Sequence, residues 1–276
     1  MKRRKVMKIA AGVFAGTGIG IFTLSNAFKS NKPIKEAPRN LEYDPPESSW
    51  KYHSLDPDET AELAYKFYSG GGCMYATVKS VIAQLAEKVG APYTSFPFQM
   101  FGYGHGGIGG YGTVCGALNG AAALIGLLVS EKSIKDSMIA DIFQWYEKTP
   151  IPEFKPKDPN FAGSLPSSVS NSVLCHASNT NWCNQSGFPI GSNERKERCR
   201  RLTSDVAKKV TVSLNEIFAH TYITNPHGEE ANTCLACHGK QGKIQNTSTS
   251  MSCNPCHSES IGHQVFSDIH YKFMKQ

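Results

Sequence analysis

Two copies of the pattern Cys-x-x-Cys-His lie close together near the end of this 276-residue chain. Two thiols at this spacing can each add to one vinyl group of a single porphyrin, and the histidine that follows then binds the iron as its proximal ligand. The residues of the two motifs are Cys234, Cys237 and His238, then Cys253, Cys256 and His257. The sequence therefore predicts two covalently bound haem c groups.

Two other interpretations fit the cysteines of these motifs. Their spacing is also that of a zinc ribbon, in which four thiolates hold a tetrahedral Zn²⁺. Two disulfide bonds are the second alternative, if the chain is exported to an oxidising compartment. Neither alternative explains the two histidines. Residues 239–252 between the motifs are also polar and poorly patterned for the strands of a zinc ribbon.

The positive charge of the chain is concentrated in its first residues. The formal net charge is +6, but five of the positive charges lie within residues 2–8, and residues 1–27 contain no acid. The rest of the chain has 24 basic and 23 acidic residues, and the propionates of two haems would make it neutral or acidic. We therefore expect no nucleic-acid partner. The 40% hydrophobic and 19% charged residues are ordinary for a globular protein of one or two domains.

Residues 1–27 have the features of an export signal. Arg3-Arg4 precedes an apolar, glycine-rich run from Ile9 to Leu24 and a small-x-small cleavage signal at residues 25–27. The paired arginines resemble a twin-arginine signal, which is an address read by a receptor. The apolar run is shorter than the roughly 20 residues of a membrane span. We expect a periplasmic protein that contacts the membrane only if the leader is not cleaved.

The chain after the leader predicts a mainly α fold. Residues 28–56 are rich in proline and have no apolar period to bury, which indicates a linker. Apolar periodicity and helix-start signals predict helices at about 57–68, 73–89, 115–129, 133–148 and 193–220. Residues 149–172 and the stretch around Cys175 and Cys183 are predicted to be irregular. We expect a helical, cysteine-bearing domain over residues 57–218 and a small, loop-rich dihaem segment over residues 219–276.

Residues 101–112 contain seven glycines and predict an irregular loop. Gly104, Gly106 and Gly109 fit the pattern G-x-G-x-x-G, but no apolar strand precedes them, so we reject a nucleotide-binding site. The loop is better suited to a close approach of its backbone to another part of the chain.

Five cysteines lie outside the haem motifs, at positions 73, 115, 175, 183 and 199. Disulfide bonds are one interpretation, although an odd number leaves one thiol unpaired. Cys73 and Cys115 fall in the first turns of predicted helices, where the helix dipole and free amides favour a thiolate. Thiolates are the ligands of iron-sulfur clusters. A cluster or another metal site is thus the alternative to disulfides.

These cysteines also carry a resemblance to a known family. The stretches S-G-G-G-C at 69–73 and V-C-G-A-L-N-G at 114–120, with the later Cys175 and Cys199, resemble the redox-active family named for its C-GCAxxG-C-C pattern. This sequence reads Cys-Gly-Ala where the pattern reads Gly-Cys-Ala. With two haem motifs added, the chain after its leader resembles the split-Soret cytochrome c family.

The resemblance implies an exported, mostly helical homodimer whose subunits each hold two closely stacked bis-histidine haems, with a proposed iron-sulfur centre. By resemblance, the candidate cluster ligands are Cys73, Cys115, Cys175 and Cys199. Cys183 has no counterpart in the family pattern, so the choice among residues 175, 183 and 199 is open.

Two bis-histidine haems need two further histidines as distal ligands. The candidates are His220, His227, His263 and His270. His263 and His270 are seven residues apart, about 10 Å along a helix, which suits two stacked irons. The resemblance adds that distal ligands can come from the other subunit. We interpret His53, His105 and His176 as ordinary surface or core residues.

The sequence thus predicts an exported dihaem cytochrome that transfers electrons between redox partner proteins through two haems and an iron-sulfur centre. Bis-histidine ligation leaves no open iron position for a substrate, so we expect no catalysis at haem. One alternative is an oxidoreductase whose cysteine centre is catalytic and receives electrons from the haems. A second alternative is a zinc-stabilised binding module without redox activity.

Overall fold

The helix α6 (Asn193–Phe218) is the longest of the described part of the chain, and four other helices pack against it. The structure is a computed structural model that describes residues 38–45, 50–225 and 228–257. Side chains at helical spacing, Leu202, Val206, Val210 and Leu214, are at most 1% exposed and form its buried stripe. The long 3.6-residue period in the sequence thus becomes the central element of the core. All described residues belong to one compact unit, residues 35–276.

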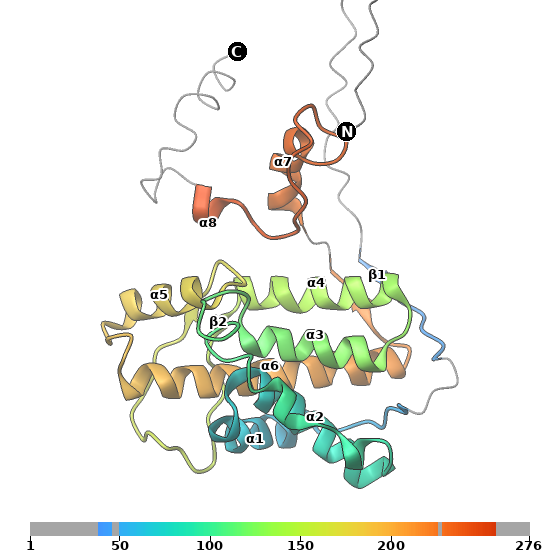
Figure 1. The fold of residues 1–276 in the computed structure, drawn as a ribbon, viewed down its shortest axis with the longest axis vertical. Coiled ribbons are helices and arrows are strands. Elements are labelled where there is room, and N and C mark those ends of the chain that lie inside the picture. Colours follow the sequence, from blue (N-terminus) through green and yellow to red (C-terminus); the bar gives the residue numbers. More distant parts are fainter. Residues whose placement is uncertain (1–37, 46–49, 226–227, 258–276) are drawn as a thin grey trace, which may run out of the picture. The chain divides into compact units, whose positions relative to one another are not determined.

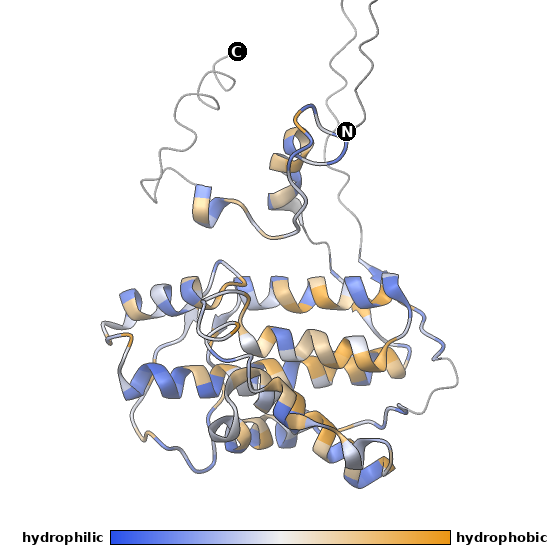
Figure 2. Ribbon diagram, viewed as in Figure 1, coloured by the Kyte–Doolittle hydropathy of each residue, from blue (hydrophilic) through white to orange (hydrophobic). Residues whose placement is uncertain are grey.

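Four helices pack against α6 or against one another. They are α1 (Pro57–Phe67), α2 (Gly72–Val89), α3 (Gly116–Leu128) and α4 (Lys132–Lys148). The helix α1 packs on α2 and α6, and α3 lies in contact with α2, α4 and α6 (Figure 1). Because α3 has neighbours on several sides, it is apolar over almost its whole length (Figure 2). The prediction of a mainly α fold is confirmed.

Short elements connect these helices. Three 3₁₀ turns cover residues Tyr68–Gly70, Tyr93–Ser95 and Phe98–Phe101. The two-residue strands β2 (Pro150–Ile151) and β3 (Ser168–Val169) pair antiparallel and close the loop after α4. No helix among the described residues is long and apolar enough to cross a membrane.

The stretch around Cys175 and Cys183 differs from the prediction, because it forms the helix α5 (Cys175–Ser186). Its sequence has no apolar stripe, so periodicity could not reveal it. The helix depends on tertiary contacts instead. Trp182 is fully buried and donates to the Pro166 carbonyl oxygen at 2.7 Å, and Asn181 donates to the Ser170 carbonyl oxygen at 2.8 Å.

The described part of the predicted linker is packed onto the helical core, although the sequence indicated nothing to bury there. Tyr43 is 2% exposed, and its hydroxyl accepts a hydrogen bond from the Ser130 amide at 3.0 Å. The strand β1 (Arg39–Asn40) pairs antiparallel with β4 (Ile223–Thr224). A lone tyrosine without periodic neighbours gives no sequence signal, but it adds burial that fixes this strand.

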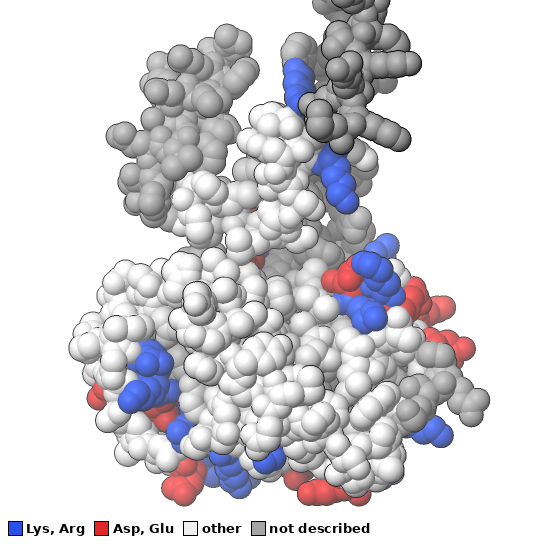
Figure 3. Space-filling model, in the orientation of Figure 1, with Lys and Arg blue, Asp and Glu red and all other residues white. Residues whose placement is uncertain are grey.

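The first haem motif ends the helix α7 (Glu229–His238), and the second begins at Cys253, directly before the short helix α8 (Asn254–His257). An irregular segment joins the two helices. On the face of the molecule seen in Figure 3, charged side chains gather at the margins and leave a wide uncharged area. The leader, residues 1–27, lies outside the described residues.

The close packing of α3 on α2 predicts a specific glycine requirement. A Cβ atom at Gly120 would lie 2.8 Å from the Thr77 Cβ and 3.0 Å from the Met74 carbonyl oxygen. We expect Gly120→Ala to reduce the free energy of unfolding by about 2 kcal/mol, because backbone must move apart. Gly126→Ala in the same helix is the control, since no atom lies within 4 Å of its Cβ position, and it should stabilise by up to about 1 kcal/mol. Equal effects in denaturant unfolding would contradict this account.

Asp205 on α6 predicts a pH dependence of stability. Its carboxylate accepts hydrogen bonds from the amides of Glu153 and Phe154 at 3.0 and 2.9 Å. Burial nevertheless raises its pKa to about 7, with Glu153 adding to the rise and the two amides and Lys208 opposing it. The folded state therefore binds this proton more tightly than the unfolded state does.

As a consequence, the stability contributed by protonated Asp205 is complete below about pH 4 and is lost as the pH rises toward 7. The effect is at most about 4 kcal/mol, since each pKa unit corresponds to about 1.4 kcal/mol. We expect the difference in free energy of unfolding between wild type and Asp205→Asn to change with this sign when measured from pH 4 to 7. A constant difference over that range would show that Asp205 is not the cause.

Candidate functional site

Cys115 and Cys175 are brought together by two short extended segments that run antiparallel. The amide of Cys115 donates to the Val173 carbonyl oxygen at 2.9 Å, and the amide of Cys175 donates to the Thr113 carbonyl oxygen at 2.7 Å. Directly after this pairing each chain segment turns into a helix, α3 after Cys115 and α5 at Cys175. Two helix N-termini therefore begin at neighbouring thiols.

Cys73 reaches the same region from the first turn of α2. The glycine-rich loop lies against this turn, because the Met74 amide donates to the Gly104 carbonyl oxygen at 3.4 Å. The Gly104 carbonyl oxygen also lies only 1.8 Å from where a Cβ atom of residue 116 would be. Position 116 therefore admits no side chain in this fold.

Cys199 completes the group from the side of α6, where it is 7% exposed. The side chain of Asn179 on α5 connects two of the thiols. Its Nδ2 donates to the Cys175 Sγ at 3.3 Å, and its Oδ1 accepts from the Cys199 Sγ at 3.3 Å. Asn179 therefore holds Cys175 and Cys199 in a common orientation.

The four thiols are close enough to affect one another electrostatically. Burial raises the pKa of Cys73 well above its usual value, and Cys115, Cys199 and Cys175 raise it further. Burial also raises the pKa of Cys115, against the opposing effects of Tyr146 and of the Ala117 and Leu118 amides at the start of α3.

Cys175 is only half-buried, but burial still raises its pKa to about 12, with Cys115 and Cys199 contributing. Without a metal the thiols of Cys73, Cys115 and Cys175 stay protonated at neutral pH. A metal would have to displace the protons, as thiolate sites generally require.

The four cysteine side chains are not oriented to coordinate a metal ion together. In the part of the chain that the structure describes, no three His, Cys, Asp or Glu groups are placed so that they could hold a metal ion. Rotation of a cysteine between staggered rotamers moves its sulfur by roughly 3 Å. The donor set, four unpaired thiols on four elements with two of them linked through Asn179, fits a thiolate-ligated metal or cluster after such rotations.

Cys183 stands apart from this group. It lies eight residues after Cys175 on the same helix, which is about 12 Å along the axis. The geometry therefore groups Cys73, Cys115, Cys175 and Cys199 and leaves Cys183 out. None of the nine cysteines, all of which lie in described residues, forms a disulfide.

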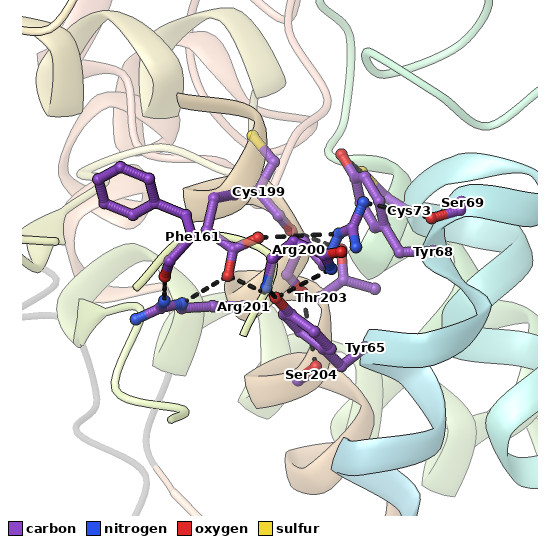
Figure 4. Close-up of polar contacts among 12 residues, drawn as sticks. Tyr65, Tyr68, Ser69, Cys73, Phe161, Cys199, Arg200, Arg201, Thr203 and Ser204 are labelled. Atoms are coloured by element: carbon purple, nitrogen blue, oxygen red, sulfur yellow. Dashed lines mark hydrogen bonds and ion pairs between the residues drawn. The ribbon is translucent and has the colours of Figure 1, made fainter. Parts of the chain in front are cut away.

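Aromatic and basic side chains lie near Cys73 and Cys199 (Figure 4). The Cys73 thiol donates to the Tyr68 hydroxyl at 3.8 Å. The Arg200 guanidinium lies over the rings of Tyr65 and Tyr68, at 5.2 and 5.4 Å from their centroids, and donates to the Ser69 hydroxyl.

Sequence reasoning missed Tyr68, Asn179 and Arg198 as parts of this site. One signal was present, a charged Arg198 beside Cys199 on a helix with a buried stripe.

The two haem motifs lie next to each other. Burial raises the pKa of Cys253, and the neighbouring Cys234 raises it further, both by its charge and through a side-chain hydrogen bond. His238 Nδ1 lies 2.9 Å from the Asn246 Oδ1. Haem-ligating histidines bind iron through one ring nitrogen while the other is held by an oxygen acceptor, so this contact suits a proximal ligand.

An apolar groove of about 680 Å³ lies beside the haem motifs. It is formed between α4 and the haem segment, with Ile139, Phe143, Val173 and Met251 among its lining residues. The unpaired thiols, the oriented His238 and this apolar surface together fit covalently attached porphyrins.

Of the four candidate distal histidines, His220 lies among the described residues. His220 follows α6, which ends at Phe218, and is exposed with a positive φ of 58°. His227, His263 and His270 lie outside the described residues. His53, His105 and His176 are exposed, and the His176 Nδ1 lies 3.0 Å from the Gly112 carbonyl oxygen.

A helical domain with four converging thiols, followed by paired haem-attachment motifs, defines a class of redox protein. The corresponding family, described as "Putative redox-active protein (C_GCAxxG_C_C)", matches residues 75–212. This range begins two residues after Cys73 and contains the other cysteines of the site.

A curated relative, the split-Soret cytochrome c of Desulfovibrio desulfuricans (strain ATCC 27774), is 40% identical over 220 residues, which are 76% of this chain and 77% of the relative. The chain belongs to the split-Soret cytochrome c family. A solved structure of the split-Soret cytochrome c from the same strain, described as having a novel iron centre, superposes with a TM-score of 0.70 at 38% identity. The match covers 76% of this chain and 90% of that one.

Proposed function

We propose that this chain is an exported dihaem c-type cytochrome that transfers electrons through two bis-histidine haems and an iron-sulfur centre. The observation that carries the proposal is the contact between Cys234 and Cys253, which belong to different haem motifs. Two haems attached through neighbouring thiols would lie close enough to exchange electrons. Membership of a cytochrome c family supports the haem assignment.

The cysteine site has the features of a second redox centre. An iron-sulfur cluster, when bound there, would supply one-electron chemistry. The chain holds Cys73, Cys115 and Cys199 in a buried, dry position, and three helix N-termini favour the negative charge of thiolates. Asn179 orients two of the ligands. The relative described as having a novel iron centre supports iron at this site.

The location and partners are also part of the proposal. The Arg3-Arg4 leader supports export to the periplasm by the twin-arginine route, which carries proteins that have already folded. A homodimer and redox partner proteins are expected from the family. Distal haem ligands are proposed among the candidate histidines 220, 227, 263 and 270.

A second function is favoured by one observation, the partial exposure of Cys175. A small substrate could reach this thiol while the other three remain buried, so the centre could act as a catalytic oxidoreductase site that the haems supply with electrons. Steady-state turnover with a small oxidant, in protein that has both haems, would distinguish this function from electron transfer alone.

Haem attachment is tested by mass. We expect the chain matured with haem-attachment machinery to gain the mass of two haems, because both motifs are complete. The variant Cys234→Ala/Cys237→Ala should gain one haem, which the intact mass and the haem absorbance both report. A wild-type mass without added haem would refute the assignment.

The cysteine centre is tested by iron content. In anaerobically purified protein, Cys115→Ser should lose non-haem iron and keep both haems, because it removes one of the four grouped thiols. Cys183→Ser is the matched control and should keep its iron, since this residue lies about 12 Å along the helix from Cys175. The measurement is the ratio of total iron to haem in the wild type and in both variants. One iron per haem in the wild type would exclude a cluster.

A further inference from the structure

The guanidinium of Arg198 is buried at the cysteine site without a full set of partners. Arg198 is 1% exposed. Its Nη2 donates to the Ser178 hydroxyl at 2.8 Å, and its Nη1 lies 4.0 Å from the Cys199 Sγ. Its Nε is buried and has no hydrogen-bond partner. A buried guanidinium nitrogen without an acceptor indicates a partner that the protonated thiols do not provide.

No carboxylate of the described chain pairs with Arg198. The nearest acid in sequence, Glu197, is paired with Arg201 at 2.9 Å between Oε1 and Nε. A guanidinium cannot lose its proton at any ordinary pH, so it cannot neutralise itself as a buried lysine can. An unpaired buried charge destabilises the folded state strongly, yet the charged side chain of Arg198 is buried in this fold. A neighbouring group that becomes negative would supply the missing charge partner.

Among the groups near Arg198, only the thiols can supply that negative charge, when a metal displaces their protons. The other neighbours are the hydroxyls of Ser178 and Tyr146, which are joined by a hydrogen bond of 2.9 Å and are neutral in ordinary conditions. Arg195 is a second cation, with its Nη1 4.0 Å from the Cys199 Sγ. The N-termini of α2, α3 and α5 add further positive potential. The site is arranged for an anion.

We propose that Arg198 is the charge partner of the thiolate-ligated state of this site, stabilising the protein when metal is bound and destabilising it when the thiols are protonated. When four thiols bind one divalent ion, they release four protons to solvent, and the site has a net charge of −2. Arg198 then faces an anion instead of a neutral thiol. This inference rests on the proposed function, since it requires a metal at these four cysteines.

The test uses Cd²⁺ as a thiolate-seeking probe. The full chain, with both haems attached, is freed of non-haem iron by a chelator under reducing conditions. Cd²⁺ affinity is then measured by competition with a second chelator. We expect Arg198→Met to weaken Cd²⁺ binding by at least about tenfold, because a buried charge next to the ligands is lost. In the metal-free protein the same variant should raise the denaturation midpoint.

Arg201→Met is the matched control. Arg201 lies three residues further on the same helix and is also largely buried, but it has a carboxylate partner in Glu197. It should lower the denaturation midpoint with and without Cd²⁺ and change the Cd²⁺ affinity by less than about threefold. Arg198→Lys keeps the charge and should retain Cd²⁺ affinity within about threefold of the wild type, which a purely hydrogen-bonding role would not predict.

The outcomes separate this inference from the proposed function. If the wild type and Arg198→Met bind Cd²⁺ equally, or if Arg198→Met lowers the midpoint by the same amount with and without Cd²⁺, the inference is wrong and the metal site stands. If the wild type binds neither iron nor Cd²⁺ at these cysteines, the proposal of a metal centre is wrong, and the inference about Arg198 is wrong as well.

Discussion

The close approach of the glycine-rich loop to the starts of α2 and α3 is the contact on which the cysteine site depends. The Gly104 carbonyl oxygen accepts from the Met74 amide and lies where a side chain at position 116 would be. Five glycines of the loop, from Gly106 to Gly112, have positive φ, a conformation that other residues rarely adopt. A bulkier loop would hold the two helices apart and separate Cys73 from Cys115.

The same geometry explains why the site favours negative charge. Cys73, Cys115 and Cys175 lie at the starts of three helices, where the positive ends of the helix dipoles favour negative charge. Burial acts in the opposite direction and keeps the metal-free thiols protonated. Such a centre would be protonated without metal and ionised once a metal is bound. Arg198 changes the balance between them.

The cysteine site and the haem-motif segment are built on different principles. The cysteine site is held by a rigid core of long helices, so its ligands can come from residues far apart in the chain. The haem motifs instead need only local spacing, because a covalently bound porphyrin would itself supply apolar surface and fix the short helices α7 and α8. This difference accounts for a small, irregular haem segment beside a well-packed helical one.

The sequence by itself determined everything that depends on local spacing. Three features depend only on residues that are close in the sequence: the Cys-x-x-Cys-His motifs, the amphipathic stripe of α6 and the cap of α1 at Asp56. The mainly α fold was predictable from such features. The grouping of Cys73, Cys115, Cys175 and Cys199 was suggested only by resemblance to a family.

Tertiary structure decided the features that depend on contacts between distant segments. The helix α5 has no apolar period and forms because Trp182 and Asn181 find partners elsewhere. The burial of Tyr43, the exclusion of a side chain at position 116 and the isolation of the Arg198 charge likewise arise only when separate elements pack together. The sequence of one segment does not predict which backbone atoms of a distant segment will pack against it.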